Sequence, residues 1–168
     1  NSGFALALFN RGETLGQIGQ HDRAIKDLDT FIKLNGGNAL AYNARGMSLS
    51  SKRDYERAIA DFSQAIRLDG KLTFAYNNRG LAYRAKGDND QAIADFSQAA
   101  RIDPTDAPAF SNRGNAYLDK LEYDRAIADL NQSIRLNPNQ VRAYYDRGIA
   151  YGAKGDTERA IADFDLAL

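Results

Sequence analysis

The sequence predicts an all-α fold in which pairs of antiparallel helices repeat along the chain. A glycine recurs every 34 residues inside one short phrase, always directly after an arginine. An Ala-Ile phrase follows twelve residues after each glycine, with an aspartate two residues further on. Two phrases in fixed phase indicate a repeat array, and this period suits a solenoid in which each repeat contacts only its neighbours. The glycines are Gly12, Gly46, Gly80, Gly114 and Gly148, and the alanines are Ala24, Ala58, Ala92, Ala126 and Ala160.

Each repeat is expected to form two helices. In the third repeat, small and apolar residues follow a helical spacing over 75–83 and again over 92–100, with a break at 86–88 between them. The break residues favour helix ends, because glycine adopts left-handed C-caps, aspartate caps N-termini and basic side chains suit the last turn. The expected C-caps are Gly19, Gly87 and Gly155, the N-caps Asp54, Asp88 and Asp156, and the last-turn cations Lys52, Lys86, Lys120, Lys154, Lys33, Arg67, Arg101 and Arg135. Five repeats therefore predict ten helices.

The period and its small residues resemble the tetratricopeptide repeat (TPR) family, and the resemblance covers nearly the whole chain. The family's aromatic fourth position falls on Leu8, Tyr42, Tyr76, Phe110 and Tyr144. Its proline near the repeat end survives only as Pro104 and Pro138. The resemblance implies a right-handed superhelical solenoid and a single array over residues 1–168, with repeats at 5–38, 39–72, 73–106, 107–140 and 141–168.

The composition of the chain limits the classes of partner that it is expected to bind. The chain has 22 basic and 22 acidic residues, so no net positive charge is available to attract nucleic acid or an anionic membrane. It has no cysteine, which excludes disulfides, thiolate nucleophiles and soft metal sites but fits cytoplasm and periplasm equally. No apolar run approaches the roughly 20 residues of a membrane span. We therefore expect neither a nucleic acid nor a membrane partner, and no compartment follows.

An arginine recurs where the resembled family usually has an aliphatic residue, and an aspartate accompanies it in every repeat. An arginine on a half-buried face needs a planar acceptor, so a ladder of structural ion pairs is favoured over a row of ligand contacts. Whether each aspartate pairs within its own repeat or with the next is open. The arginines are Arg11, Arg45, Arg79, Arg113 and Arg147, and the aspartates are Asp27, Asp61, Asp95, Asp129 and Asp163.

The resemblance also implies a concave groove, lined by the first helix of each repeat, that binds partner peptides. These positions vary between repeats while the packing positions stay uniform, which a binding surface on a fixed scaffold would show. The predicted groove residues are Phe9, Asn10, Asn43, Met47, Phe74, Asn77, Asn78, Leu81, Ser111, Asn112, Asn115, Arg142, Tyr145 and Asp146.

The asparagines suggest a ladder that pairs with a peptide backbone, because an amide both donates and accepts hydrogen bonds. Such a ladder resembles the one in O-linked N-acetylglucosamine transferases, although Ala44 and Asp146 interrupt it and simple solvation of the face remains an alternative. The family's two-carboxylate clamp for chaperone C-terminal tails is disfavoured, since Asn112 alone matches it and Asp146 reverses the charge required.

Catalysis is not expected, because the single histidine, His21, has no second histidine, cysteine or phosphate loop beside it. No cofactor or metal is implied. The predicted function is a non-catalytic protein-interaction scaffold that binds an extended peptide of no strong net charge. The alternatives are a structural unit that self-associates through uncapped solenoid ends, since the last repeat stops apolar without a polar cap, and a regulatory array of a larger protein.

Overall fold

The computed structural model describes residues 2–168, and it divides into two compact units. Unit 1 extends to Lys86 and unit 2 begins at Gly87. Unit 1 contains α1 (Ser2–Gln17), α2 (His21–Leu34), α3 (Ala39–Ser51), α4 (Tyr55–Leu68) and α5 (Thr73–Ala85). Unit 2 contains α6 (Asn89–Ile102), α7 (Ala107–Asp119), α8 (Tyr123–Leu136), α9 (Val141–Ala153) and α10 (Thr157–Leu166).

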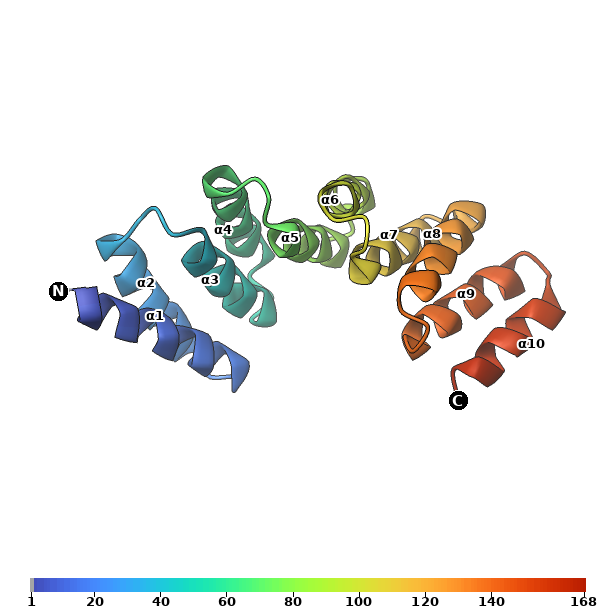
Figure 1. Cartoon of the computed structure of the whole chain (residues 1–168), viewed down its shortest axis with the longest axis horizontal. Coiled ribbons are helices and arrows are strands. Elements are labelled where there is room, and N and C mark those ends of the chain that lie inside the picture. The colour runs from blue at the N-terminus through green and yellow to red at the C-terminus, as the bar shows by residue number, and fades with distance from the viewer. Residues whose placement is uncertain (1) are drawn as a thin grey trace. The chain divides into compact units, whose positions relative to one another are not determined.

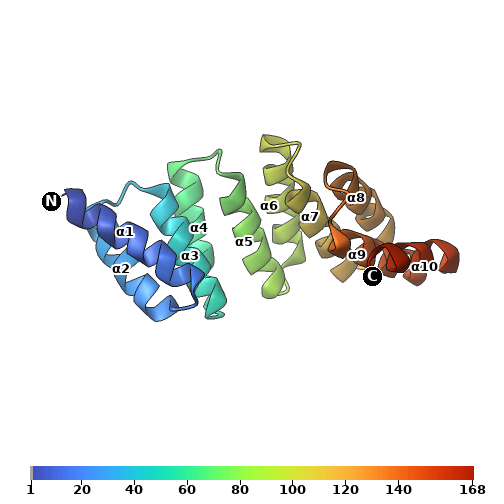
Figure 2. The ribbon, with the colours of Figure 1, turned by 60° about the horizontal axis from the view of Figure 1, so that its bottom comes forward.

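Within each unit, consecutive helices pack against one another as hairpins. In unit 1, α1 packs on α2 and α3 on α4, while in unit 2 α7 packs on α8 and α9 on α10 (Figure 1). The first helices also contact each other, α1 with α3, α3 with α5, and α7 with α9. Figure 2 shows the same hairpins from a second direction. The all-α fold of ten helices is confirmed over residues 2–168, whereas the repeat boundaries stay predictions.

The recurring glycine lets the two helices of a hairpin cross closely. A Cβ at Gly46 would lie 2.7 Å from Phe62 Cε1, and one at Gly148 would lie 2.6 Å from Phe164 Cε1. At Gly114 the nearest atom would be Leu130 Cγ at 2.9 Å. The side chain that fills the glycine notch is therefore a Leu or Phe of the second helix, and the recurring Ala contributes its backbone carbonyl close by.

The buried core runs along these crossings. In unit 1 one cluster contains Leu8, Leu28 and Phe31, and another contains Leu49 and Phe62. In unit 2 the cluster contains Ala126, Leu130, Ile134 and Ala143. Because each cluster joins one hairpin to the first helix of the next, burial of apolar surface holds successive pairs together.

The turns agree with the sequence analysis except at the four lysines that follow the first helices. Gly19, Gly87 and Gly155 adopt the left-handed conformation, with φ of 79°, 86° and 81°. The four lysines lie one residue beyond their helices, as C-caps rather than in the last turn. Asp54, Asp88 and Asp156 occupy the N-cap positions as predicted; Asp54 and Asp156 accept backbone hydrogen bonds there, whereas the side chain of Asp88 does not.

Candidate functional site

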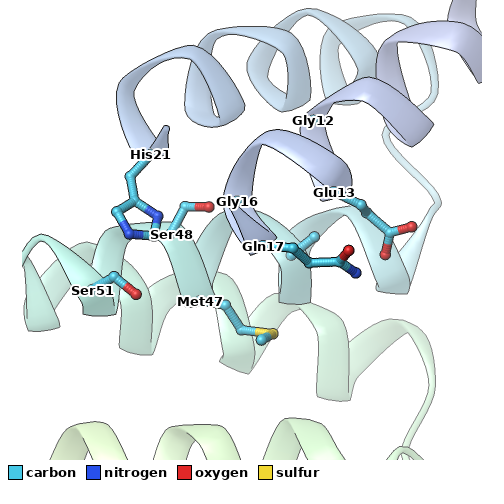
Figure 3. A pocket seen from close by; sticks show the side chains of 9 residues that line it. Gly12, Glu13, Gly16, Gln17, His21, Met47, Ser48 and Ser51 are labelled. Atoms are coloured by element: carbon cyan, nitrogen blue, oxygen red, sulfur yellow. The ribbon is translucent and has the colours of Figure 1, made fainter. Parts of the chain in front are cut away.

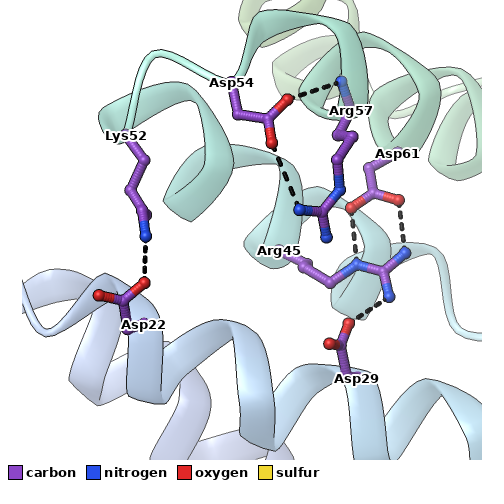
Figure 4. A network of polar contacts seen from close by, with 7 residues as sticks. All are labelled: Asp22, Asp29, Arg45, Lys52, Asp54, Arg57 and Asp61. Carbon is purple, nitrogen blue, oxygen red and sulfur yellow. Dashed lines mark hydrogen bonds and ion pairs between the residues drawn. The ribbon is translucent and has the colours of Figure 1, made fainter.

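The recurring arginines bind aspartates of the same hairpin. Arg45 donates from Nε and Nη2 to the two oxygens of Asp61 at 2.7 and 2.6 Å (Figure 4). The other pairs with this two-point geometry are Arg11 with Asp27, Arg113 with Asp129 and Arg147 with Asp163. Arg79 and Asp95 belong to different units, and their pairing stays a prediction. Planar guanidinium and carboxylate groups match in this arrangement, which makes the ion pair geometrically specific.

The remaining nitrogen of each interior arginine reaches back to the preceding hairpin. Arg45 Nη1 donates to Asp29 Oδ1 at 2.6 Å (Figure 4). Equivalent bonds join Arg79 to Ser63, Arg113 to Ser97 and Arg147 to Asn131, always sixteen residues back along the chain. Sequence reasoning missed these partners because they change identity between repeats. Only their constant spacing could have indicated them.

These contacts make the ladder a structural feature. The hydrogen bond to Asp61 raises the pKa of Arg45, and those to Asp129 and Asp163 raise the pKa of Arg113 and Arg147. The arginine side chains of these interior pairs are about one-fifth exposed, so their donors are occupied and mostly shielded from solvent. They are not available as a cationic surface for a ligand.

A second row of ion pairs joins successive hairpins at the turn end. Lys52 binds Asp22 in Figure 4, and Lys86 binds Glu56 at 2.9 Å. Lys120 and Lys154 bind Asp90 and Asp124 in the same way. These side chains are largely exposed, so each pair contributes little free energy and helps mainly to fix the register between hairpins.

The first helices of unit 1 present exposed apolar side chains. Leu40 and Met47 lie seven residues apart on α3, and Phe74 and Leu81 lie seven apart on α5, so each pair occupies one helix face. All four are more than two-fifths exposed, as is Leu6 on α1. Because α1, α3 and α5 contact in turn, these residues form adjacent rows, which we call the unit 1 face.

The amides of unit 1 are engaged within the protein. Asn43 is buried, and its Oδ1 accepts a hydrogen bond from Asn78 Nδ2 at 3.0 Å. Asn43 Nδ2 in turn lies 3.5 Å from Met47 Sδ. Asn77 is also buried, whereas Asn10 is exposed. Phe9 packs its ring against Phe31. The buried asparagines and Phe9 therefore support the unit 1 face from within, whereas Asn10 lies at the surface.

The corresponding unit 2 face is mixed in character. It is defined by the exposed residues Arg142, Tyr145 and Ile149 and the half-buried residues Asn112 and Asn115. Arg142 Nε donates to both oxygens of Asp146 at 2.9 and 3.0 Å, and its guanidinium lies over the Tyr145 ring. Asp146 itself is buried.

Ser111 belongs to a buried hydrogen-bond chain beneath this unit 2 face. Its Oγ accepts from Gln140 Nε2, and the Gln140 side-chain oxygen accepts from Ser133 Oγ. Of the residues predicted for the groove in this unit, Ser111 and Asp146 therefore serve internal bonding.

A small cleft lies between α1 and α3 beside the start of α2 (Figure 3). Its volume is about 120 Å³, and its walls include Glu13, Gln17, His21, Met47 and Ser48. Desolvation raises the pKa of the Glu13 carboxyl. The histidine stands at the first residue of α2, where its Nδ1 is buried without a hydrogen-bond partner among residues 2–168. Sequence reasoning did not anticipate this cleft, although Gly16 opposite Ser48 is a signal for missing volume.

The helical hairpins, together with the arginines that join a hairpin to the preceding one, define an α-solenoid. Sequence models of the tetratricopeptide repeat match residues 9–73, and models of the TPR repeat match residues 80–120 and 119–155. The chain belongs to the tetratricopeptide repeat family. Membership supports a protein-interaction scaffold, and repeats of this kind are in general non-catalytic.

Solved structures share this fold. A crystal structure of the MamA protein is 24% identical, covers 100% of this chain and 92% of its own, and has a TM-score of 0.87. A second MamA crystal structure is 26% identical over 93% of this chain and 91% of its own, with a TM-score of 0.84. The YrrB crystal structure is 22% identical over 99% and 86%, with a TM-score of 0.78. No curated protein matches the sequence. No helix within residues 2–168 has the length and apolar character of a membrane span.

Proposed function

We propose that this chain is a non-catalytic scaffold that binds an extended segment of a partner protein along its first helices, with the apolar face of unit 1 as the principal contact. The observation that carries the proposal is the row of exposed apolar residues on α1, α3 and α5. Contiguous exposed apolar side chains on a folded protein mark interaction sites more often than isolated ones do.

The hydrogen bonds that the asparagines make inside the protein limit the kinds of contact that a partner can make. The Asn78 amide already donates to the side-chain oxygen of Asn43, which leaves fewer amide groups to pair with a peptide backbone. Recognition on unit 1 then depends on apolar side chains of the partner. Full burial of one such side chain contributes about 1.5 to 3 kcal/mol to binding, from which the entropy cost of ordering the partner segment is subtracted. On unit 2, Asn112, Asn115 and the exposed edge of Arg142 offer polar contacts to the same or another segment.

The family assignment and a structural relative support this class of function. YrrB, which has the same fold, is a TPR protein with an unusual peptide-binding site. The zero net charge of this chain favours partners without strong net charge.

The test is selection from a displayed random-peptide library, followed by anisotropy titration of the enriched peptides. We expect a Phe74→Ala/Leu81→Ala double variant to weaken binding about tenfold or more, because two anchors on the face are lost. The matched control is Leu34→Ala/Leu68→Ala, which removes two exposed leucines from the carboxyl ends of α2 and α4. It should bind as the parent chain does.

Exchanging the residues at one equivalent position between the two units tests which unit makes the principal contact with the peptide. Leu81 and Asn115 are equivalent positions one period apart. Leu81→Asn should weaken the selected peptides, while Asn115→Leu should leave their affinity unchanged or improve it. Absence of any enriched peptide, or affinities that do not change when Phe74 and Leu81 are replaced, would contradict the proposal.

A further inference from the structure

One position of the unit 1 face carries a charge among apolar side chains. Leu6 and Glu13 lie seven residues apart on α1, in the same register as the apolar pairs on α3 and α5. Glu13 is therefore equivalent to Met47 and Leu81, and all three are exposed. The Glu13 carboxylate makes no hydrogen bond or ion pair within residues 2–168. A segment that lies along this face thus meets one unpaired carboxylate.

Beside Glu13 the unit 1 face opens into the cleft between α1 and α3 (Figure 3). Gly16 and Ala44 supply little side chain to its walls, and the volume of about 120 Å³ is several times the room that one water molecule needs. Ser48 lines the cleft and is only 3% exposed. A Cβ at Gly16 would lie 3.1 Å from Ser48 Oγ, so the lack of a side chain at Gly16 keeps the hydroxyl open to the cleft.

Ser48 differs from its equivalents in the later repeats, which are the buried alanines Ala82, Ala116 and Ala150. Its hydroxyl makes no hydrogen bond within residues 2–168. A buried hydroxyl without a partner costs free energy, and alanine at this position packs the later hairpins without that cost. Packing between hairpins therefore does not account for this serine, whereas a ligand that donates a hydrogen bond to it does.

The charge around the cleft favours a cation. Partial desolvation raises the pKa of the Glu13 carboxyl, and no basic side chain offsets this effect. Lys52, just beyond the end of α3, is bound to Asp22 rather than to Glu13. A cation supplied by a partner would restore the interactions that the carboxylate loses to burial. The cleft thus selects a positively charged hydrogen-bond donor.

We propose that the cleft receives an arginine side chain of the bound segment, an inference that rests on the proposed function of the unit 1 face. The guanidinium pairs with the Glu13 carboxylate and donates to Ser48 Oγ, while its methylene groups lie against Ala44 and Met47. Arginine suits the cleft better than lysine, because Figure 3 shows Glu13 and Ser48 on different sides of it. A guanidinium directs donors from three nitrogens to separate acceptors, whereas an ammonium is a compact point charge. A single arginine in an otherwise apolar segment is consistent with a partner of low net charge.

The test uses the peptides enriched from the displayed library, which we expect to share one arginine at a fixed spacing from their apolar residues. Each peptide is synthesised with that arginine retained, replaced by lysine, or replaced by citrulline, which keeps the shape of arginine without its charge. Anisotropy titrations should show that the arginine peptide binds most tightly. Glu13→Gln should weaken the arginine peptide about fivefold or more and change the citrulline peptide by less than about twofold.

Two further variants separate this contact from folding and from general charge effects. Ser48→Ala should weaken the arginine peptide without loss of stability, since it removes a hydroxyl that has no partner in the free protein. Glu158→Gln removes the same charge from an exposed position on α10 and should leave the affinity unchanged. Circular dichroism establishes that each variant is folded.

The outcomes distinguish this inference from the proposed function on which it rests. Enriched peptides without a shared arginine, or equal losses of the arginine and citrulline peptides in Glu13→Gln, would overturn the arginine site. The proposed function would still stand if Phe74→Ala/Leu81→Ala weakened the same peptides. A library without any enriched peptide would overturn both.

Discussion

The two units use the same scaffold but present different faces. In both, a Leu or Phe of the second helix fills a glycine notch, and an arginine joins its own aspartate to the preceding hairpin. Unit 1 exposes leucine, methionine and phenylalanine on its first helices, whereas unit 2 exposes arginine beside tyrosine, valine and isoleucine on α9 and has half-buried asparagines on α7. The comparison shows that the positions that fix the backbone and the positions that face a partner are separate, so one can vary without the other.

Loss of a ladder arginine should have the largest effect, and the same effect in both units. Arg45→Met leaves Asp61 buried without its cation, and Arg113→Met does the same to Asp129. Removing one partner of such a pair costs about 3 kcal/mol or more. Hydrogen exchange measured by mass spectrometry, which localises unfolding in repeat proteins, should show the loss around the altered hairpin.

Arg11→Met is the control for the ladder, because it is the same substitution at a mostly exposed arginine. Water replaces much of the lost contact there, so we expect a loss of stability clearly smaller than that at Arg45 or Arg113. If Arg45→Met and Arg113→Met cost no more than Arg11→Met, the ladder would not stabilise the scaffold.

Filling the glycine notch should be the next largest effect. Gly46→Leu in unit 1 and Gly114→Leu in unit 2 would clash with Phe62 and Leu130, and overpacking of this kind costs about 1 to 3 kcal/mol. Urea unfolding followed by circular dichroism measures it. In the control Gly152→Ala, the added Cβ lies 3.8 Å from Ala160 Cβ, an ordinary contact. Since alanine favours helix over glycine by about 1 kcal/mol, that variant should gain stability. A loss in the control would contradict this account.

The turns offer a smaller, stabilising change in each unit. Arg53 in unit 1 and Leu121 in unit 2 adopt the left-handed conformation, with φ of 63° and 62°, at positions where other repeats have glycine. The left-handed region costs an ordinary residue about 1 kcal/mol or more, although glycine also loses more entropy on folding. Arg53→Gly and Leu121→Gly should therefore each raise the free energy of unfolding by about 0.5 kcal/mol. The reverse change, Gly87→Ala, should lower it, and thermal melts of the three variants compare them.

Acid sensitivity should be the smallest effect, and it should arise from different groups in the two units. The hydrogen bond from Arg11 lowers the pKa of Asp27, and bonds from Thr105 lower the pKa of Asp103. A carboxyl whose pKa is lower in the folded state than in the unfolded state stabilises the protein fully at pH values above its unfolded-state pKa of about 3.9. This contribution is lost as the pH falls through the pKa of the folded state. Asp27→Asn and Asp103→Asn should flatten the decline in stability below about pH 4 in units 1 and 2 respectively. Unchanged acid profiles would show that these bonds carry no pH dependence.

Particular residues show how far sequence reasoning reached. The period placed the helix pairs, and the left-handed glycines followed from their position after each first helix. The groove residues were placed less well: Asn43, Ser111 and Asp146 are buried or internally bonded, because their side chains lie between helices rather than wholly in solvent. A periodic pattern assigns a side chain to a helix face but does not give the distance to the next helix.

The sequence by itself determined the helix pairs, the recurring glycine and alanine positions and the recurrence of arginine with aspartate, since all of these repeat at one fixed spacing. The tertiary structure alone decided which side chain fills the glycine notch, that Asp27, Asp61, Asp129 and Asp163 bind within their own hairpins, and that the third arginine nitrogen reaches the preceding hairpin. Those contacts join side chains whose separation depends on how hairpins stack, and packing between helices sets that stacking.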